Sequence, residues 1–213
     1  MLKLRLTLMI VLVVLVAGAT VEAATINLFA NLSNGAENPP TVPTLTTGAP
    51  RPASFGIATF VLNDAIPQMT FTATIFNIDV TGSQTADTND NLVAAHIHAS
   101  ATVTPTTNGP VVWGFFGAPF NDNNPNDFVF TPFATGVGGT FSGKWDPPEG
   151  NGTTLAAQMN NILTGHSYIN FHTSQFGGGE IRGNIVALPE PSTICMLGIG
   201  IAALIGLGRR RSR

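Results

Sequence analysis

The chain has 213 residues and a formal net charge of −3, and only 10% of its residues are charged. Six of the nine basic residues lie in the first five and last five positions, so residues 24–188 keep three basic residues against ten acidic ones, a net charge of −7. So acidic a region cannot neutralise a row of phosphates, which excludes nucleic acid as a partner. The single cysteine, Cys195, lies near the C-terminus, which excludes a disulfide and a thiolate metal site from residues 24–188.

The N-terminal residues have the pattern of a secretory signal peptide. Lys3 and Arg5 give a positive start, and Leu6–Val16 is an apolar stretch of typical length. The segment Val21-Glu22-Ala23 then places small residues at the positions that a signal peptidase reads before its cleavage site. We therefore expect a signal peptide over residues 1–23, cleaved after Ala23 with Ala19 as the alternative, and an exported mature protein.

Residues 24–188 are expected to form one all-β domain, because glycine, proline, threonine and asparagine divide them into short segments. The fold class that we predict is an antiparallel β-sandwich or Greek-key barrel of about eight strands with one short helix. The predicted strands are Ile26–Leu32, Ser54–Leu62, Gln68–Phe76, Leu92–His98, Val111–Phe116, Gly139–Lys144, Ser167–His172 and Glu180–Ile185.

Alternation along the strands predicts which face of each is buried, because successive side chains point to opposite sides. In Gln68–Phe76 the residues Met69, Phe71, Ala73 and Ile75 share an apolar face, and threonines occupy the other. In Ser167–His172 the residues Ile169 and Phe171 are expected to face the core, and Tyr168, Asn170 and His172 to form a polar face.

One segment has helical rather than strand periodicity. In Thr153–Leu163 the apolar residues Leu155, Met159 and Ile162 recur at helical spacing after threonines that can cap a helix, and Gly165 can end it. We expect a short amphipathic helix over one end of the sheet.

Long connections join several of the strands, and binding residues often lie on such loops. The segments of this kind are Asn38–Arg51, Thr81–Asn91, Ala99–Pro110 and Pro119–Phe133. The aromatic residues Trp113, Phe115, Phe116 and Phe120 could offer a surface on which sugars stack, but aromatic residues in strands more often belong to the core.

The motif Ala95-His96-Ile97-His98 is the sharpest local signal for chemistry. Two histidines separated by one residue on a strand share a face about 7 Å apart, so they can bind one metal ion together. His172 and Glu180 complete a predicted copper or zinc site if their strands are neighbours. The alternative is structural: the histidines bond to backbone groups, Glu180 pairs with Arg182 or another neighbour, and His166 is a loop residue.

The sequence contains no motif of an enzyme that we can identify. It has no serine nucleophile elbow, no phosphate loop and no zinc-protease helix. The glycine run in Phe176–Glu180 lacks the lysine and following helix of a nucleotide loop and predicts a hairpin turn instead. We therefore expect a protein that binds rather than catalyses.

The last 25 residues resemble the PEP-CTERM sorting signal of Gram-negative bacteria. Pro189-Glu190-Pro191 is the recognition triplet, an apolar run from Ile194 to Leu207 lies within a predicted transmembrane segment over residues 194–208, and Arg209–Arg213 forms a positive end. The resemblance implies processing by an exosortase, often beside exopolysaccharide production. An ordinary C-terminal membrane anchor is the alternative.

Three motifs, in order, make residues 24–188 resemble the CHRD domain, which is named after chordin and is common in exported bacterial proteins. They are Ala94–His98 followed by Asn108–Val112, Leu163–Thr173, and Gly178–Gly183. The segment Ala30–Pro40 is similar to the first strand and loop of that domain. The resemblance implies a β architecture and an extracytoplasmic location, but no settled biochemical activity.

Together these patterns predict an exported, exosortase-sorted protein without enzyme activity that works as a binding module of the outer cell surface or the extracellular matrix. Its expected partners are signal peptidase and exosortase during processing, and exopolysaccharide or other envelope components afterwards. The C-terminal segment would anchor it transiently in the inner membrane. A copper- or zinc-binding envelope protein is the alternative function.

Overall fold

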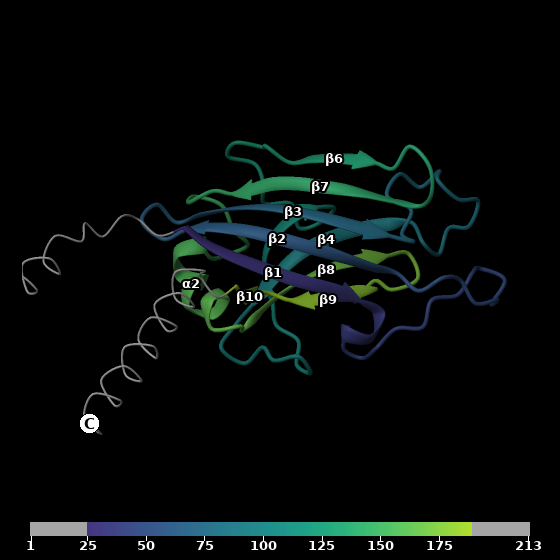
Figure 1. The fold of residues 1–213 in the computed structure, drawn as a ribbon, viewed down its shortest axis with the longest axis horizontal. Helices are drawn as coiled ribbons and strands as arrows, with labels where there is room; N and C mark the ends of the chain where they lie inside the picture. Colours follow the sequence, from purple (N-terminus) through teal and green to yellow (C-terminus); the bar gives the residue numbers. More distant parts are fainter. Residues whose placement is uncertain (1–24, 189–213) are drawn as a thin grey trace, which may run out of the picture.

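The computed structural model describes residues 25–188, which fold into one curled antiparallel sheet with a single α-helix (Figure 1). The order of the strands is β5-β4-β8-β9-β1-β2-β3-β7-β6, and β10 pairs with β1. This architecture confirms the predicted all-β class. The strands are β1 (Thr25–Ser33), β2 (Phe55–Asn63), β3 (Gln68–Phe76), β4 (Leu92–Ala99), β5 (Val111–Phe116), β6 (Val129–Pro132), β7 (Gly138–Trp145), β8 (Ser167–Thr173), β9 (Ile181–Asn184) and β10 (Val186–Ala187).

The two-residue period of β2 and β3 sets which face of the sheet turns inward. In β3 the residues Met69, Phe71, Ala73 and Ile75 are buried, as predicted, and in β2 the buried residues are Gly56, Ala58, Phe60 and Leu62. Each buried residue of β2 pairs directly with a buried residue of β3 in the register of the two strands. The intervening residues of β2 stay outside, and Ile57 is 51% exposed.

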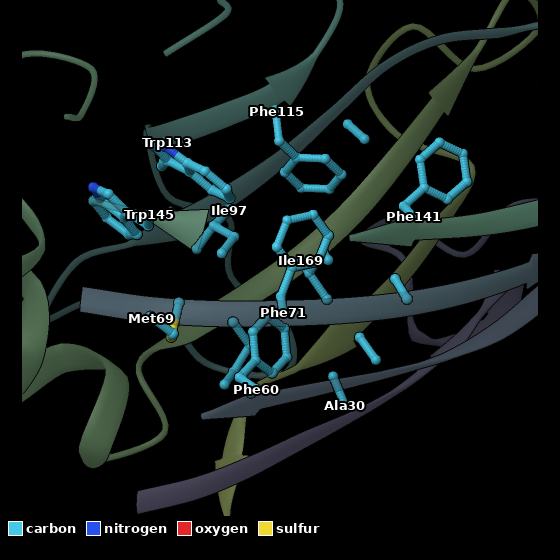
Figure 2. Close-up of a cluster of buried hydrophobic side chains, with 14 of the residues drawn as sticks. Ala30, Phe60, Met69, Phe71, Ile97, Trp113, Phe115, Phe141, Trp145 and Ile169 are labelled. Atoms are coloured by element: carbon cyan, nitrogen blue, oxygen red, sulfur yellow. The ribbon is translucent and has the colours of Figure 1, made fainter. Parts of the chain in front are cut away.

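An aromatic cluster fills the inside of the curl and joins strands that are distant in the sheet order. Trp113 of β5 stacks on Trp145 of β7 with ring centroids 5.7 Å apart, and Phe115 of β5 packs on Phe71 of β3 at 4.5 Å (Figure 2). Because β5 is an edge strand, these contacts hold the two ends of the sheet together. The expectation that aromatic residues in strands belong to the core is therefore confirmed for Trp113 and Phe115, which are fully buried and cannot form a sugar-stacking surface.

The polar face of β8 is covered rather than open to solvent. Tyr168, Asn170 and His172 are between 1% and 7% exposed, although Ile169 and Phe171 fill the core on the opposite face. Loop residues lie over this face: the Tyr168 hydroxyl donates to the carbonyl of Gly109, and a ring nitrogen of His172 bonds to the carbonyl of Gly177. The middle of the sheet thus has a second, polar interior.

The helix forms as expected and two short strands were missed by the sequence prediction. Helix α2 spans Leu155–Leu163, where Thr154 caps the first turn by accepting from the Ala157 N–H. A 3-10 turn, η1 (Asn34–Ala36), follows β1. The missed strands are β6, which lies in a segment read as a loop, and β10, which has only two residues.

No helix among residues 25–188 is long and apolar enough to cross a membrane. The predicted cleavage position at Ala23, the Pro189-Glu190-Pro191 triplet and the segment 194–208 lie outside the described residues.

The aromatic cluster predicts where the fold is most sensitive to truncation. Phe141 is fully buried and contacts Phe171 with ring centroids 5.4 Å apart. Phe141→Ala should lower the free energy of unfolding by about 3–5 kcal/mol, because it leaves a cavity in the core. Val129→Ala on the exposed edge strand is the control and should change it by less than about 0.5 kcal/mol. Urea unfolding of both variants measures the difference, and equal effects would contradict this account of the core.

Candidate metal centre

The pairing of β4 with β8 brings three histidines together on the polar face of the sheet. His96 lies opposite Asn170, His98 lies opposite Tyr168, and Ala94 lies opposite His172. One ring nitrogen from each of His96, His98 and His172 can be chosen so that all three lie within 4.8 Å of one another. The three side chains are between 4% and 8% exposed, so this grouping, which we call the histidine cluster, is almost fully enclosed.

Each imidazole of the histidine cluster uses its other ring nitrogen to bond to a backbone carbonyl. The three bonds are His96 Nε2 to Ala118 O at 3.1 Å, His98 Nδ1 to Gly109 O at 2.8 Å, and His172 Nδ1 to Gly177 O at 3.0 Å. A carbonyl oxygen can only accept, so in a neutral imidazole these nitrogens carry the proton. The remaining nitrogens, His96 Nδ1, His98 Nε2 and His172 Nε2, therefore present lone pairs.

Those lone pairs face one another. His96 Nδ1 lies 3.1 Å from His172 Nε2, and His98 Nε2 is buried without a hydrogen-bond partner. Two lone pairs at such a distance repel each other, and a metal ion bound to both nitrogens would remove that repulsion. A metal-bound histidine commonly donates the N–H of its second ring nitrogen to a carbonyl or carboxylate oxygen, and each of these histidines bonds to a carbonyl in this way.

Burial keeps these imidazoles in the form that binds metals. Desolvation, together with the proximity of the other histidines, lowers the pKa of His96 to about 4. Desolvation likewise lowers the pKa of His98 to about 4 and lowers that of His172, against the opposing effect of their carbonyl bonds. At neutral pH all three are uncharged, so no proton has to leave before a metal ion can bind.

Glu180 does not lie in the histidine cluster. Its carboxylate accepts from Arg51 at 2.5 Å, from Ser54 Oγ at 2.5 Å and from Thr173 Oγ1 at 2.6 Å, and it is fully buried. Thr173 follows His172 in β8, where successive side chains point to opposite faces. The expectation that Glu180 converges with the histidines is corrected by this placement, because Arg51 and two hydroxyls occupy its oxygens.

Two further sequence interpretations can be compared with the structure. Arg182 does not pair with Glu180; it lies 3.6 Å from the centre of the Tyr168 ring and donates to Asn108 Oδ1 at 2.8 Å. His166 is a half-buried residue after the helix, and its Nδ1 bonds to the carbonyl of Val103 at 2.7 Å, away from the histidine cluster.

Sequence reasoning missed Asn170 and Glu37, which line the same polar interior. Asn170 is 1% exposed and Glu37 is 5% exposed. One side-chain oxygen of each, Oδ1 of Asn170 and Oε2 of Glu37, has no hydrogen-bond partner. Asn170 lies directly opposite His96 on the polar face, and its Nδ2 lies against the same glycine, Gly179, as the Glu37 carboxylate. The alternation of β8, which puts Asn170 and His172 on one face, was the available signal for Asn170.

Comparison with protein families decides the identity of this β domain, since the family model of the CHRD domain matches residues 28–185. The chain belongs to the CHRD domain family. A second model, of the PEP-CTERM protein-sorting motif, matches residues 187–212, directly after the CHRD domain. No curated protein and no solved structure matches the chain.

Both predicted resemblances are therefore confirmed, and they bear on location more than on chemistry. The sorting motif implies processing by an exosortase and an exported, cell-surface protein. Neither CHRD domains nor PEP-CTERM motifs are enzyme families. Among residues 25–188, the histidine cluster is the group of side chains that could hold a metal ion.

The lowered pKa values predict how stability depends on pH. In the unfolded chain a histidine titrates near 6.5, but folded His96 and His98 titrate near 4, so below pH 6.5 the unfolded state binds more protons. The free energy of unfolding of chelator-treated protein should therefore fall as the pH drops from 6.5 to 4. The His98→Gln variant should show a shallower fall over that range in urea titrations, and an unchanged slope would contradict this assignment.

The position of Glu180 predicts a structural role for its carboxylate. Glu180→Gln removes the partner of Arg51, whose side chain is 3% exposed, so we expect a loss of about 3–5 kcal/mol in the free energy of unfolding. The exposed Asp64→Asn is the matched control and should change it by less than about 0.5 kcal/mol. A metal content that fell in Glu180→Gln while stability was unchanged would restore Glu180 as a ligand.

Proposed function

We propose that this exported CHRD domain binds a transition-metal ion, copper or zinc, through His96, His98 and His172. The observation that carries the proposal is the arrangement of the imidazoles: each donates one N–H to a backbone carbonyl, and one ring nitrogen of each lies within 4.8 Å of those of the other two. Such a set is held in place before any ion arrives, which lowers the cost of ordering the ligands.

The donor set favours copper or zinc over other common cations. Neutral imidazole suits zinc and copper, whereas calcium and magnesium prefer carboxylate and carbonyl oxygens. The three side chains are almost completely buried, so an ion among them would be held with little access for a substrate. Binding, rather than turnover, is the activity that fits this enclosure.

Metal content tests the proposal. Protein purified from cells supplied with copper or zinc should carry about one equivalent of metal by elemental analysis. The triple variant His96→Ala, His98→Ala, His172→Ala should carry almost none, because no donor nitrogens remain. His166→Ala is the matched control, since its imidazole also bonds to a carbonyl but lies outside the histidine cluster.

Folding has to be followed in the same experiment. Circular dichroism and urea unfolding of the metal-free proteins show whether a loss of metal reflects a loss of structure. Near-zero metal in both the natural protein and the triple variant, with both folded and after incubation with either ion, would end the proposal.

A second candidate function is that of a cell-surface or matrix component that binds exopolysaccharide or other envelope material. The observation in its favour is the sorting motif at residues 187–212, which implies delivery to the surface. Residues 24–188 have a net charge of −7, so neutral or cationic partners suit them better than anionic ones. Deletion of the gene should reduce attachment or alter matrix composition, and an unchanged matrix would count against this candidate.

A further inference from the structure

We propose that Asn170 is the fourth donor to the metal ion held by the histidine cluster, through its side-chain oxygen, and that Glu37 positions Asn170 for this role. This inference rests on the proposed metal-binding function. It replaces Glu180, the fourth ligand expected from the sequence, with a residue that faces the imidazoles.

The position of Asn170 in the sheet places it next to the histidine cluster. It lies on β8 directly opposite His96 of β4, and two residues before His172 on the same face. His98 is the next residue of β4 on that face, diagonal to Asn170 across the strand pair. Asn170 is therefore adjacent to all three members of the histidine cluster.

Asn170 also has a side-chain oxygen that lacks a hydrogen-bond partner. Its Oδ1 is buried and has no donor, and the nitrogen of His98 that remains unbonded, Nε2, is buried without a partner as well. Both atoms are acceptors when His98 donates its Nδ1 proton to Gly109. Leaving two buried acceptors unpaired is costly, and one cation between them would satisfy both.

The orientation of the Asn170 amide follows from Glu37. Nδ2 of Asn170 and Oε2 of Glu37 both lie against the backbone of Gly179, so the NH₂ end of the Asn170 amide is the end near Glu37, and Oδ1 is the end turned away from it. Glu37 itself is fixed, because its Oε1 accepts from the N–H of Asn38 at 3.0 Å. A carboxylate that orients a ligand in this way is a common second layer around protein metal sites.

Gly179 allows this arrangement. Its backbone has a φ of +126°, and a Cβ at this position would collide with the Glu37 carboxylate and with Nδ2 of Asn170. Both groups therefore lie directly against the glycine backbone. This close approach gives a physical reason for one of the glycines that follow Phe176.

A pocket lies beside the residues that surround Asn170. Its volume is about 410 Å³, and its lining includes Glu37, Asn108 and the loop Phe176–Gly179. The carbonyl of Gly177 in that loop accepts from His172, and Gly179 lies against both the Glu37 carboxylate and Nδ2 of Asn170. The pocket wall is thus made of the residues that hold two of the proposed ligands.

The test is the affinity of the purified full chain for Zn²⁺, measured by competition with a chromophoric chelator, together with the visible spectrum of the Co²⁺-loaded protein. Asn170→Ala should weaken Zn²⁺ binding by about 10–100-fold and should change the Co²⁺ absorption bands, because the donor set changes. Asn160→Ala, on the exposed side of α2, is the matched control and should leave both readouts unchanged.

Two more variants separate ligation from a merely structural role. Asn170→Asp combined with Glu37→Gln keeps an oxygen donor of the same length without setting two carboxylates side by side, so it should bind Zn²⁺ at least as tightly as the natural protein. Glu37→Ala removes the positioning group and should weaken binding by less than Asn170→Ala does. If Asn170→Ala fails to fold, the double variant decides, and weaker binding in that variant overturns the proposal.

The outcomes distinguish this inference from the function on which it rests. A natural protein that binds no metal removes the proposed function itself. A natural protein that binds metal, with an Asn170→Ala variant of equal affinity and identical Co²⁺ spectrum, removes only the role of Asn170.

Discussion

The antiparallel register of β4 against β8 places Ile97 opposite Ile169 on one face and His96 opposite Asn170 on the other. Because side chains alternate along a strand, a single register decides both the centre of the apolar core and the composition of the polar face. A slip of one residue would carry the imidazoles into the aromatic cluster and the isoleucines out of it. The pairing is fixed by the cost of that exchange, so the same burial that stabilises the fold also places the histidine cluster.

Burying the polar face of β8 requires partners for its polar atoms, and the covering loops supply them. Carbonyls of Gly109, Ala118 and Gly177 accept from the three imidazoles, and each comes from a different connection between strands. Polar atoms in a folded interior are normally paired. His98 Nε2, Asn170 Oδ1 and Glu37 Oε2 are among the exceptions and belong to this polar interior, and they are a physical basis for the proposed metal site and its fourth ligand.

The sequence predicted this fold where apolar periodicity was strong, as in β3, whose bounds and buried face are both as expected. It also predicted that His96, His98 and His172 could meet, because two of them share one strand face and the third lies on a polar one. It failed for Glu180, since the Arg51 that binds it is remote in sequence and nothing local indicates the pairing. Glu37 was missed for the same reason: it follows β1, and only the tertiary arrangement brings it to β8. Strand β6 carries four exposed residues and so lacks the alternation by which strands are recognised.

Strand β10 ends the folded body almost at the first residue of the sorting triplet. Val186 and Ala187 pair with β1, and the N–H of Leu188 donates to the carbonyl of Asn27 near the start of the domain. There is consequently no spacer between the sheet and Pro189. An exosortase that recognises this triplet would act one residue from a hydrogen-bonded part of the sheet, and release of the two-residue strand β10 would lengthen the segment open to it. Because neither side chain of β10 is buried, that release would leave the core of the domain in place.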